Sequence, residues 1–399
     1  MIKNKIKKMK MLLFIFSFLF ISIRTIEIKG YKLILNDTKS TLDGTTLNST
    51  ETNGVTYIDG IIKITLEGTY ILSGTLNGQI KVNSTGTIIL VINGVIIKNL
   101  DSNAILFENA YELDPSITIN TNPEKPLDIT KAGAQIIIAD GTENIVDGAS
   151  QKEKDGAIHS DVSILITGEK KGDGILNVIG SSEGIETNKN LFISGGILKI
   201  VSQEDGINAS KRLSCIIIIR GGKLLINAGL GRNGDGVDSN GYILVEGGEI
   251  FSAAHIREDS GLDATQDLII NGGSVFSVGS DMDMASPLSR QPSMNLIFED
   301  NVTPSSIVTV TDSDGNEIIS FSAGSIDFIR GTERRDYYAA VVSHPNFKDK
   351  GVYHLYINGT QLGYTGNKKS HGYISSGPII SDFILGSSTT YFSGIQKLL

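Results

Sequence analysis

Residues 205–227 read DGINASKRLSCIIIIRGGKLLIN, the clearest of several related phrases in the chain. The phrase holds an Asp-Gly-Ile start, a hydrophobic run, a Gly-Gly pair and a second hydrophobic run. Similar starts lie 28, 22, 30 and 25 residues apart, at Asp155, Glu183, Asp205, Asp235 and Ser260. A phrase that recurs at a period of about 20 to 50 residues is typical of a stack of repeats that add strands to shared sheets.

The Gly-Gly pairs form a second column in step with the first. They lie 26, 26 and 25 residues apart, at positions 195–196, 221–222, 247–248 and 272–273, each between two β-rich runs. Neighbouring repeats would lie about 4.8 Å apart, so that apolar residues at matching strand positions stack into a continuous core. We therefore predict a parallel β-helix in which each Gly-Gly pair is a structural turn between two strands.

Composition supports an all-β chain, since it has 45 Gly, 8 Pro and many β-branched residues. A polar stretch at 31–54 is predicted to be a loose lead-in, and the β-helix is predicted over 55–290. From 291 to 399 the strands become irregular. We expect this segment to be a β-rich cap, because the open end of a stacked sheet invites aggregation unless it is covered.

The first thirty residues predict a secretory signal peptide. Five lysines precede an apolar run from Met11 to Ile23, which is shorter than the roughly 20 residues that a membrane span requires. An uncleaved signal anchor is the alternative. The main prediction places the mature chain outside the cell or at the cell surface, without a membrane span.

Charge limits the partners of the mature chain. The first thirty residues carry a net charge of +6 (six Lys and one Arg against one Glu), so the remainder carries −15 instead of the −9 of the whole chain. Such a surface repels nucleic acid and attracts metal cations. Cys215 is the only cysteine and is expected to be a buried thiol. Six Asn-x-Ser/Thr sequons are compatible with an exported glycoprotein: Asn36, Asn48, Asn83, Asn208, Asn301 and Asn358.

Acidic residues recur at fixed positions of the repeated phrase. The third residue is apolar and is expected to point inward, so strand alternation turns the fourth residue outward. The fourth positions hold Ile158, Glu186, Asn208, Asp238 and Asp263. The first positions add Asp155, Glu183, Asp205 and Asp235, and Glu204 and Asp259 extend the acidic edge by one residue.

Stacked carboxylates of this kind favour a bound cation. At strand spacing they come within about 5 Å of one another, where each raises the pKa of its neighbour unless a cation lies between them. Oxygen donors without a Cys or His cluster suit Ca²⁺. The alternative is purely structural, since Asp-Gly is a common turn pair whether or not anything binds. His159 is expected to fill space inside the stack.

Taken together, these phrases resemble the family of secreted, calcium-binding carbohydrate-binding β-helix proteins, whose architecture is related to that of pectate lyases. The resemblance covers about residues 60–290. It implies a right-handed parallel β-helix that binds cellulose or acidic plant polysaccharides such as pectin. It also implies metal ligands at Asp155, Glu183, Glu186, Asp205, Asp235, Asp238, Asp259 and Asp263. Ile158, Asn208 and Ser260 depart from the acidic pattern, so the number of sites stays open.

Three functions follow as alternatives. The one we expect is a non-catalytic polysaccharide-binding protein whose Ca²⁺ ions bridge to glycan carboxylates; the absence of Trp favours acidic glycans over crystalline cellulose. The second is a structural or adhesive surface protein that Ca²⁺ only rigidifies. The third is a Ca²⁺-dependent polysaccharide lyase, which needs a basic residue to remove a proton. Arg220, Arg232 and Arg257 are the candidates for that base.

Overall fold

The computed structural model describes residues 29–113, 127–150, 154–231, 233–254, 258–323, 336–366 and 379–398. Residues 31–399 form one unit. The predicted signal peptide lies almost entirely outside the described residues, as do Arg232 and Arg257. Within the described ranges the chain is all-β apart from one 3-10 turn, Ile129–Lys131, and no helix there is long and apolar enough to span a membrane.

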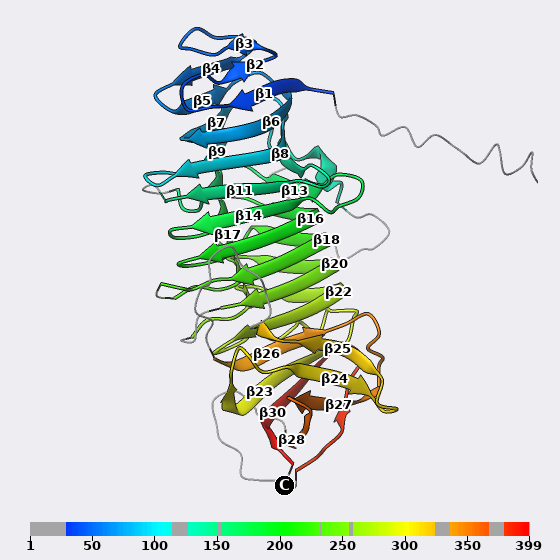
Figure 1. Cartoon of the computed structure of the whole chain (residues 1–399). Helices are drawn as coiled ribbons and strands as arrows, with labels where there is room; N and C mark the ends of the chain where they lie inside the picture. Colours follow the sequence, from blue (N-terminus) through cyan, green and yellow to red (C-terminus); the bar gives the residue numbers. More distant parts are fainter. Residues whose placement is uncertain are drawn as a thin grey trace, which may run out of the picture. The chain divides into compact units, whose positions relative to one another are not determined.

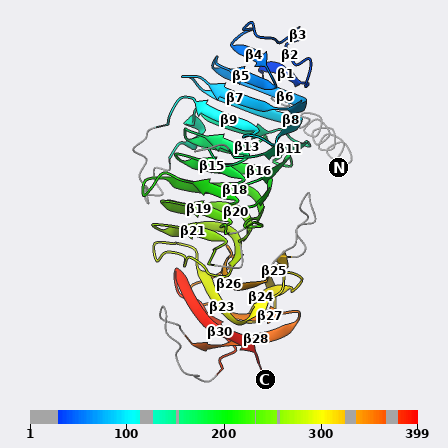
Figure 2. The same cartoon turned by 90° about the vertical axis from the view of Figure 1, so that its left-hand side faces the viewer.

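A sheet of nine short strands carries the repeated Asp-Gly phrase (Figures 1 and 2). From β5 onward each strand pairs in parallel with the strand of the next repeat. The strands are β4 (Val55–Ile58), β5 (Ile61–Ile64), β7 (Gln79–Asn83), β9 (Ile105–Asn109), β12 (Ile158–Ser160), β15 (Ile185–Thr187), β17 (Ile207–Ala209), β19 (Val237–Ser239) and β21 (Leu262–Ala264). We call this the short sheet.

The hydrophobic runs form a second, larger parallel sheet, which Figure 1 shows in chain order from β6 to β22. Its parallel strands are β1 (Tyr31–Leu35), β6 (Gly68–Asn77), β8 (Ile88–Asn99), β10 (Ala134–Ile138), β11 (Glu143–Gly148), β13 (Ile164–Gly168), β14 (Ile175–Gly180), β16 (Leu191–Ser202), β18 (Ile216–Asn227), β20 (Tyr242–Ala253) and β22 (Leu268–Gly279). β1 belongs to the predicted lead-in, yet it pairs in parallel with β6. Two short strands, β2 (Thr41–Leu42) and β3 (Thr45–Thr46), follow β1.

The Gly-Gly pairs lie inside single long strands and do not separate two strands, which corrects the predicted turn. In β16 the register shifts on both sides of Ser194. The second glycine of each pair has a positive φ, for example +90° at Gly222. A Cβ at Gly222 would lie 2.9 Å from the Gly196 carbonyl oxygen of the preceding repeat. Only glycine therefore allows this bulge to stack on itself, and the strand bends without ending.

Matching strand positions stack into one continuous core. In the short sheet the inward column consists of Ile62, Ile80, Ile105, Ile158, Ile185, Ile207, Val237 and Leu262. Every member of this column is fully buried. Burial of each such side chain contributes roughly 1.5–3 kcal/mol, so the stack is held mainly by these repeated aliphatic contacts.

The large sheet also buries part of its outer face. The outward column Leu165, Phe192, Ile218, Leu244 and Ile269 is at most 7% exposed. It packs with Leu113, Ile129 and Ala132. Arg220 on β18 ties this covering segment down, because its Nη1 donates to the Leu127 carbonyl and its Nε to Glu246. A strand that is apolar on both faces, such as Cys215-Ile-Ile-Ile-Ile, is the sequence sign of such double burial.

The C-terminal strands adjoin the end of the large sheet. They are β23 (Ser293–Val302), β24 (Val308–Asp312), β25 (Glu317–Phe321), β26 (Tyr337–Ser343), β27 (Val352–Ile357), β28 (Thr360–Gly366), β29 (Phe383–Ile384) and β30 (Thr389–Lys397). β26 pairs antiparallel with β22, so the last strand of the stacked repeats has a partner. Phe321 also stacks on Phe251 and packs at a tilt against Phe276, with ring centroids 4.6 and 4.1 Å away. This segment therefore covers part of the outer face as well as the edge.

Candidate metal-binding face

One outward position of the short sheet collects the polar residues of five repeats. His159, Glu186, Asn208, Asp238 and Asp263 stand opposite one another on β12, β15, β17, β19 and β21. We call this column the acidic row. Its members alternate with the inward aliphatic column, so the usual strand spacing of about 4.8 Å brings the polar side chains side by side.

The first repeat departs from the predicted register by one residue. Ile158 pairs with Ile185 and is fully buried in the core, whereas His159 stands opposite Glu186. The expectation that Ile158 points outward and His159 fills space inside was therefore wrong. The repeat contains one extra residue between Asp155 and its strand, and a shift of one residue exchanges the two faces of a strand.

The first acidic positions lie at the bends that lead into the strands. Asp205 accepts the backbone N–H of Asp235 at 2.8 Å, and Asp235 accepts that of Ser260 at 2.6 Å. Each carboxylate is thus fixed to the next repeat. The glycine that follows allows this approach, since a Cβ at Gly206 would lie 2.5 Å from the Gly236 carbonyl oxygen. The repeated Asp-Gly pair therefore aligns one carboxylate above another.

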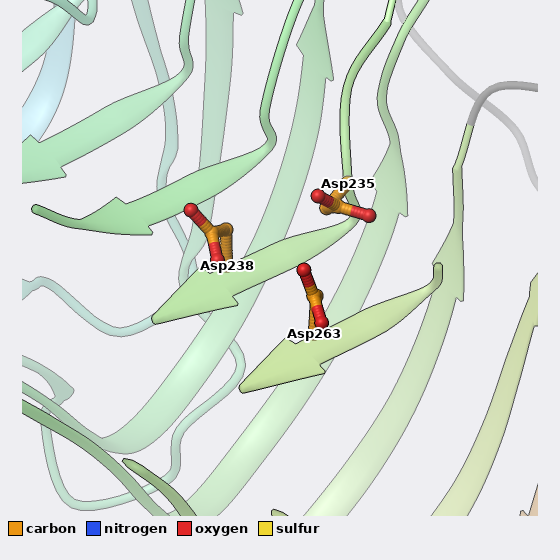
Figure 3. Close-up of side chains that lie close together, drawn as sticks. All are labelled: Asp235, Asp238 and Asp263. Carbon is orange, nitrogen blue, oxygen red and sulfur yellow. The ribbon is translucent and has the colours of Figure 1, made fainter. Parts of the chain in front are cut away.

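Three aspartates converge at the lower end of the row. Asp235, Asp238 and Asp263 each offer a carboxylate oxygen, and these oxygens lie within 4.8 Å of one another (Figure 3). Burial, followed by the charges of the neighbouring aspartates, raises the pKa of Asp235 and of Asp238 to about 8 each. Without a counter-ion, the charged forms of Asp235 and Asp238 are disfavoured at neutral pH.

A second group of oxygens lies next to the first. Burial, then the charges of Glu186 and Asp205, raises the pKa of Glu183 to about 9. Glu183 Oε1 accepts the Asn208 side-chain amide at 2.8 Å. Glu183 Oε2 and Asn208 Oδ1 are buried without a hydrogen-bond partner among the described residues. Burial raises the pKa of Asp205 to about 6, with nearby carboxylates adding to the effect. Unsatisfied buried oxygens beside carboxylates match what a hard cation requires.

Asn208 cannot serve as a glycan acceptor in this fold. It is only 8% exposed, and its side-chain nitrogen is bonded to Glu183. Of the six predicted sequons, this one is therefore committed to the acidic face.

Asp283 is a member of the site that the sequence reasoning missed. Its Oδ2 accepts the Ala264 N–H at 2.8 Å. Burial and the neighbouring Asp263 raise the pKa of Asp283 to about 7. It follows the last Asp-Gly-type repeat but is not itself followed by glycine, so the repeated phrase does not include it. The alternating Asp281-Met-Asp283 pattern is the only signal that could have indicated a further acidic position.

The remaining predicted ligands lie at the margins of the site. The Asp155 backbone N–H donates to Glu186 Oε2 at 2.8 Å, and burial followed by the charge of Glu186 raises the pKa of Asp155. Asp259 is buried and its charge contributes to the raised pKa of Asp205. The structure does not bring either one into the group formed by Asp235, Asp238 and Asp263.

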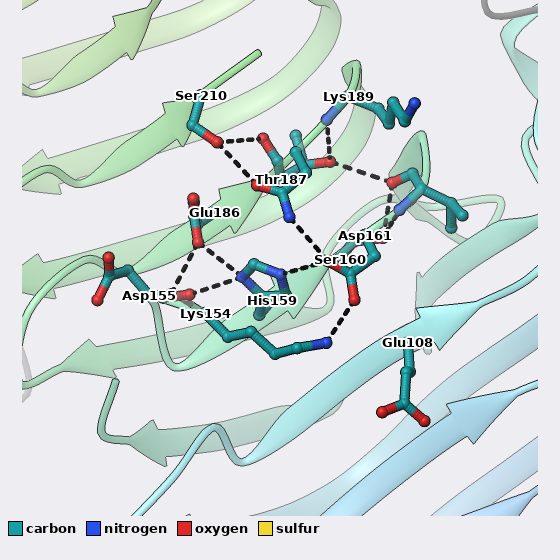
Figure 4. A network of polar contacts seen from close by, with 12 residues as sticks. Glu108, Lys154, Asp155, His159, Ser160, Asp161, Glu186, Thr187, Lys189 and Ser210 are labelled. Atoms are coloured by element: carbon teal, nitrogen blue, oxygen red, sulfur yellow. Dashed lines mark hydrogen bonds and ion pairs between the residues drawn. The ribbon is translucent and has the colours of Figure 1, made fainter. Parts of the chain in front are cut away.

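The upper end of the row has a different chemistry, which Figure 4 shows. His159 is fully buried, with Nδ1 2.6 Å from Glu186 Oε2 and Nε2 3.2 Å from Asp161 Oδ1. Burial alone would lower the pKa of His159, but the bonds and charges of Glu186 and Asp161 outweigh it and raise that pKa. Lys154 is bonded to the same Asp161. At this end the carboxylates are thus balanced by side chains of the protein.

These features define an all-β protein of stacked parallel strands with an acidic, oxygen-rich face on one sheet. A family model described as carbohydrate-binding domain-containing protein matches residues 58–122 and 114–326, and the chain belongs to this family. The second match spans the whole acidic row. One solved structure is similar to this chain: a gadolinium derivative of the polysaccharide lyase-like protein from C. thermocellum. It is 22% identical, with a TM-score of 0.47, and the match covers 64% of this chain and 94% of that one. No curated protein matches the chain.

Proposed function

We propose that this chain is a secreted or cell-surface, non-catalytic polysaccharide-binding protein that holds Ca²⁺ on its acidic face. The single observation that carries the metal is the convergence of Asp235, Asp238 and Asp263. Family membership supports the carbohydrate. We further infer that the stacked strands form a right-handed parallel β-helix.

The donor atoms fit Ca²⁺ better than a softer metal. The carboxylates of Asp235, Asp238, Asp263 and Asp283 would hold a cation at the lower end, and Glu183 Oε2 with Asn208 Oδ1 and Asp205 would serve next to it. All of these donors are oxygens, and Ca²⁺ takes six to eight of them from carboxylates, amides, backbone and water. When bound, the ion supplies the positive charge that the buried carboxylates lack.

An acidic glycan is the ligand that this face favours. A cation held by fewer than its full number of protein oxygens can accept further oxygens, including those of a uronate carboxylate. Neutral sugars are usually held by stacking on exposed aromatic rings. Tyr111 and Tyr338 are the exposed tyrosines among the described residues, and they belong to different segments, after β9 and within β26. The chain has no Trp.

The lyase alternative has less support. Of its three candidate bases, only Arg220 is described, and it lies on the large sheet, where Glu246 and the Leu127 carbonyl hold its guanidinium. The Arg220 side chain is therefore held by structural hydrogen bonds, and it does not lie on the short sheet that carries the acidic face.

The test is titration of Ca²⁺ into the metal-free chain, followed by retention on immobilised polygalacturonate and on cellulose, with and without Ca²⁺. We expect saturable Ca²⁺ binding and Ca²⁺-dependent retention on polygalacturonate only. Asp238→Asn combined with Asp263→Asn should abolish both, whereas Asp314→Asn, at an exposed position between β24 and β25, should change neither.

The outcomes separate the three functions. Ca²⁺ binding without retention on either glycan would favour a structural surface protein. Release of unsaturated products from polygalacturonate would favour a lyase. Absence of Ca²⁺ binding at millimolar concentration would remove the basis of the proposal.

A further inference from the structure

The two ends of the acidic row carry different pairs of side chains. On β19 and β21, Asp238 stands opposite Asp263, and both side chains are carboxylates. On β12 and β15, the same outward position pairs His159 with Glu186. The backbone register is the same in both places, so the difference lies in the side chains alone.

The contacts of Glu186 leave little room for an external cation at its Oε2 atom. That oxygen lies 2.6 Å from His159 Nδ1 and accepts a hydrogen bond from the Asp155 backbone N–H at 2.8 Å. Glu186 is only 6% exposed. By contrast, Glu183 Oε2 is buried and has no hydrogen-bond partner among the described residues. Two glutamates three residues apart thus differ in whether the protein itself satisfies them.

A second set of bonds holds the imidazole in place. Its Nδ1 also lies 3.1 Å from the Asp155 carbonyl, and its Nε2 lies 3.2 Å from Asp161 Oδ1. Asp161 is in turn bonded by Lys154 and by the Asn188 amide, the latter at 2.7 Å. Both ring nitrogens therefore face carboxylates, and the ring cannot turn away without breaking several bonds.

We propose that His159 is a built-in partner that takes the place of a metal ion at this end of the acidic row, so that Glu186 is not a metal ligand and cation binding begins at Glu183 and Asn208. A metal next to Glu186 would compete with the His159 N–H for the same oxygen. The inference deepens the proposed function and rests on it for the metal.

The test compares the number of Ca²⁺ ions bound by the wild-type chain with the numbers bound by three variants. Glu186→Gln should leave that number unchanged, because the amide oxygen can still accept both bonds. Glu183→Gln should lower it, since it removes an unsatisfied carboxylate oxygen. His159→Asp should raise it by one ion, because it recreates at β12 and β15 the carboxylate pair of β19 and β21.

A second measurement does not depend on counting ions. In a chain labelled with ¹⁵N-histidine, the His159 ring signals should stay in place as Ca²⁺ is added. A large shift of these signals, or loss of a bound ion in Glu186→Gln, would overturn the inference. A wild-type chain that binds no Ca²⁺ would instead refute the proposed function, and the metal-replacing role of His159 with it, so the two failures are distinguishable.

Discussion

Two side-chain pairs occupy the same outward position of the short sheet: His159 with Glu186, and Asp238 with Asp263. They differ in how their buried charge is balanced. The histidine pair is satisfied within the chain. The aspartate pair places two carboxyl groups side by side, and the charged form of Asp238 is disfavoured there. A repeated backbone thus decides where a side chain points, and the residue at that position decides whether the balancing charge comes from the protein or from solution.

Removal of the His159 ring should have the largest effect on the stability of the fold. His159→Ala leaves Glu186 and Asp161 without the ring between them, and breaking a buried charge pair costs about 3–5 kcal/mol. We expect the free energy of unfolding, measured by urea denaturation, to fall by that amount both with and without Ca²⁺. The independence from Ca²⁺ is what distinguishes this end of the row from the other.

A second histidine pair provides the control for this variant. His354 lies 3.4 Å from Asp382 and both are partly exposed, so His354→Ala should cost at most about 1 kcal/mol. If Ca²⁺ restored the stability that His159→Ala removes, the two ends of the row would not differ in the way described.

The aspartate pair should show the opposite dependence. In the wild-type chain, Ca²⁺ at one hundred times its dissociation constant should stabilise the fold by about 2.7 kcal/mol per site. Asp238→Asn removes a carboxyl group whose ionisation the metal-free fold disfavours, so it should raise the melting temperature of the metal-free chain and lower that of the Ca²⁺-loaded chain. Calorimetric melting with Ca²⁺ and with EDTA measures both. A variant that is less stable in both conditions would show that Asp238 has a structural role only.

The pH dependence of the metal-free chain should follow the raised pKa values. Asp235 and Asp238 titrate near 8 and Glu183 near 9 in the fold, against 3.8 and 4.5 for the unfolded chain. The unfolded state releases these protons first, so their contribution to stability is present at low pH and is lost as the pH rises toward 8–9. The loss amounts to at most about 1.4 kcal/mol per pH unit for each group.

His159 gives a change of the same sign, since its pKa is also raised, and the Asp238→Asn variant is needed to separate the two. Urea denaturation between pH 5 and pH 9 should show a shallower slope in that variant. Saturating Ca²⁺ should flatten the part due to the carboxylates, because it keeps them ionised in the fold. A slope that is unaffected by both would assign the effect to other groups.

The stack of strands was predictable because the alternation of inward and outward residues can be read within each short strand. Ile207, Val237 and Leu262 each follow a glycine and precede a polar residue, so the inward and outward faces are evident. The burial of the outward column around Phe192 and Ile218 was less evident. A run of four isoleucines does not indicate which segment covers the second face of the strand. The covering segment lies far away in the sequence and carries no repeat.

The site was predictable where the phrase is regular and not where it varies. Asp235, Asp238 and Asp263 follow from alternation and spacing. The placement of His159 did not, because one extra residue in a bend is invisible until the strand partners define the register. Asp283 was missed for a related reason, since its contact with Ala264 depends on how the chain leaves the last repeat.

Asp283 therefore provides the test with the smallest expected effect on the difference between the two ends of the row. It extends the aspartate end by one carboxylate next to Asp263, so Asp283→Asn should weaken Ca²⁺ binding without abolishing it. We expect a loss of up to tenfold, which corresponds to about 1.4 kcal/mol, in a calorimetric titration. Asp281→Asn changes an exposed carboxylate two residues away and should leave the affinity within about twofold, as expected for a screened surface charge. Equal losses in both variants would mean that this segment acts through its general negative charge, and the set of ligands would then end at Asp263.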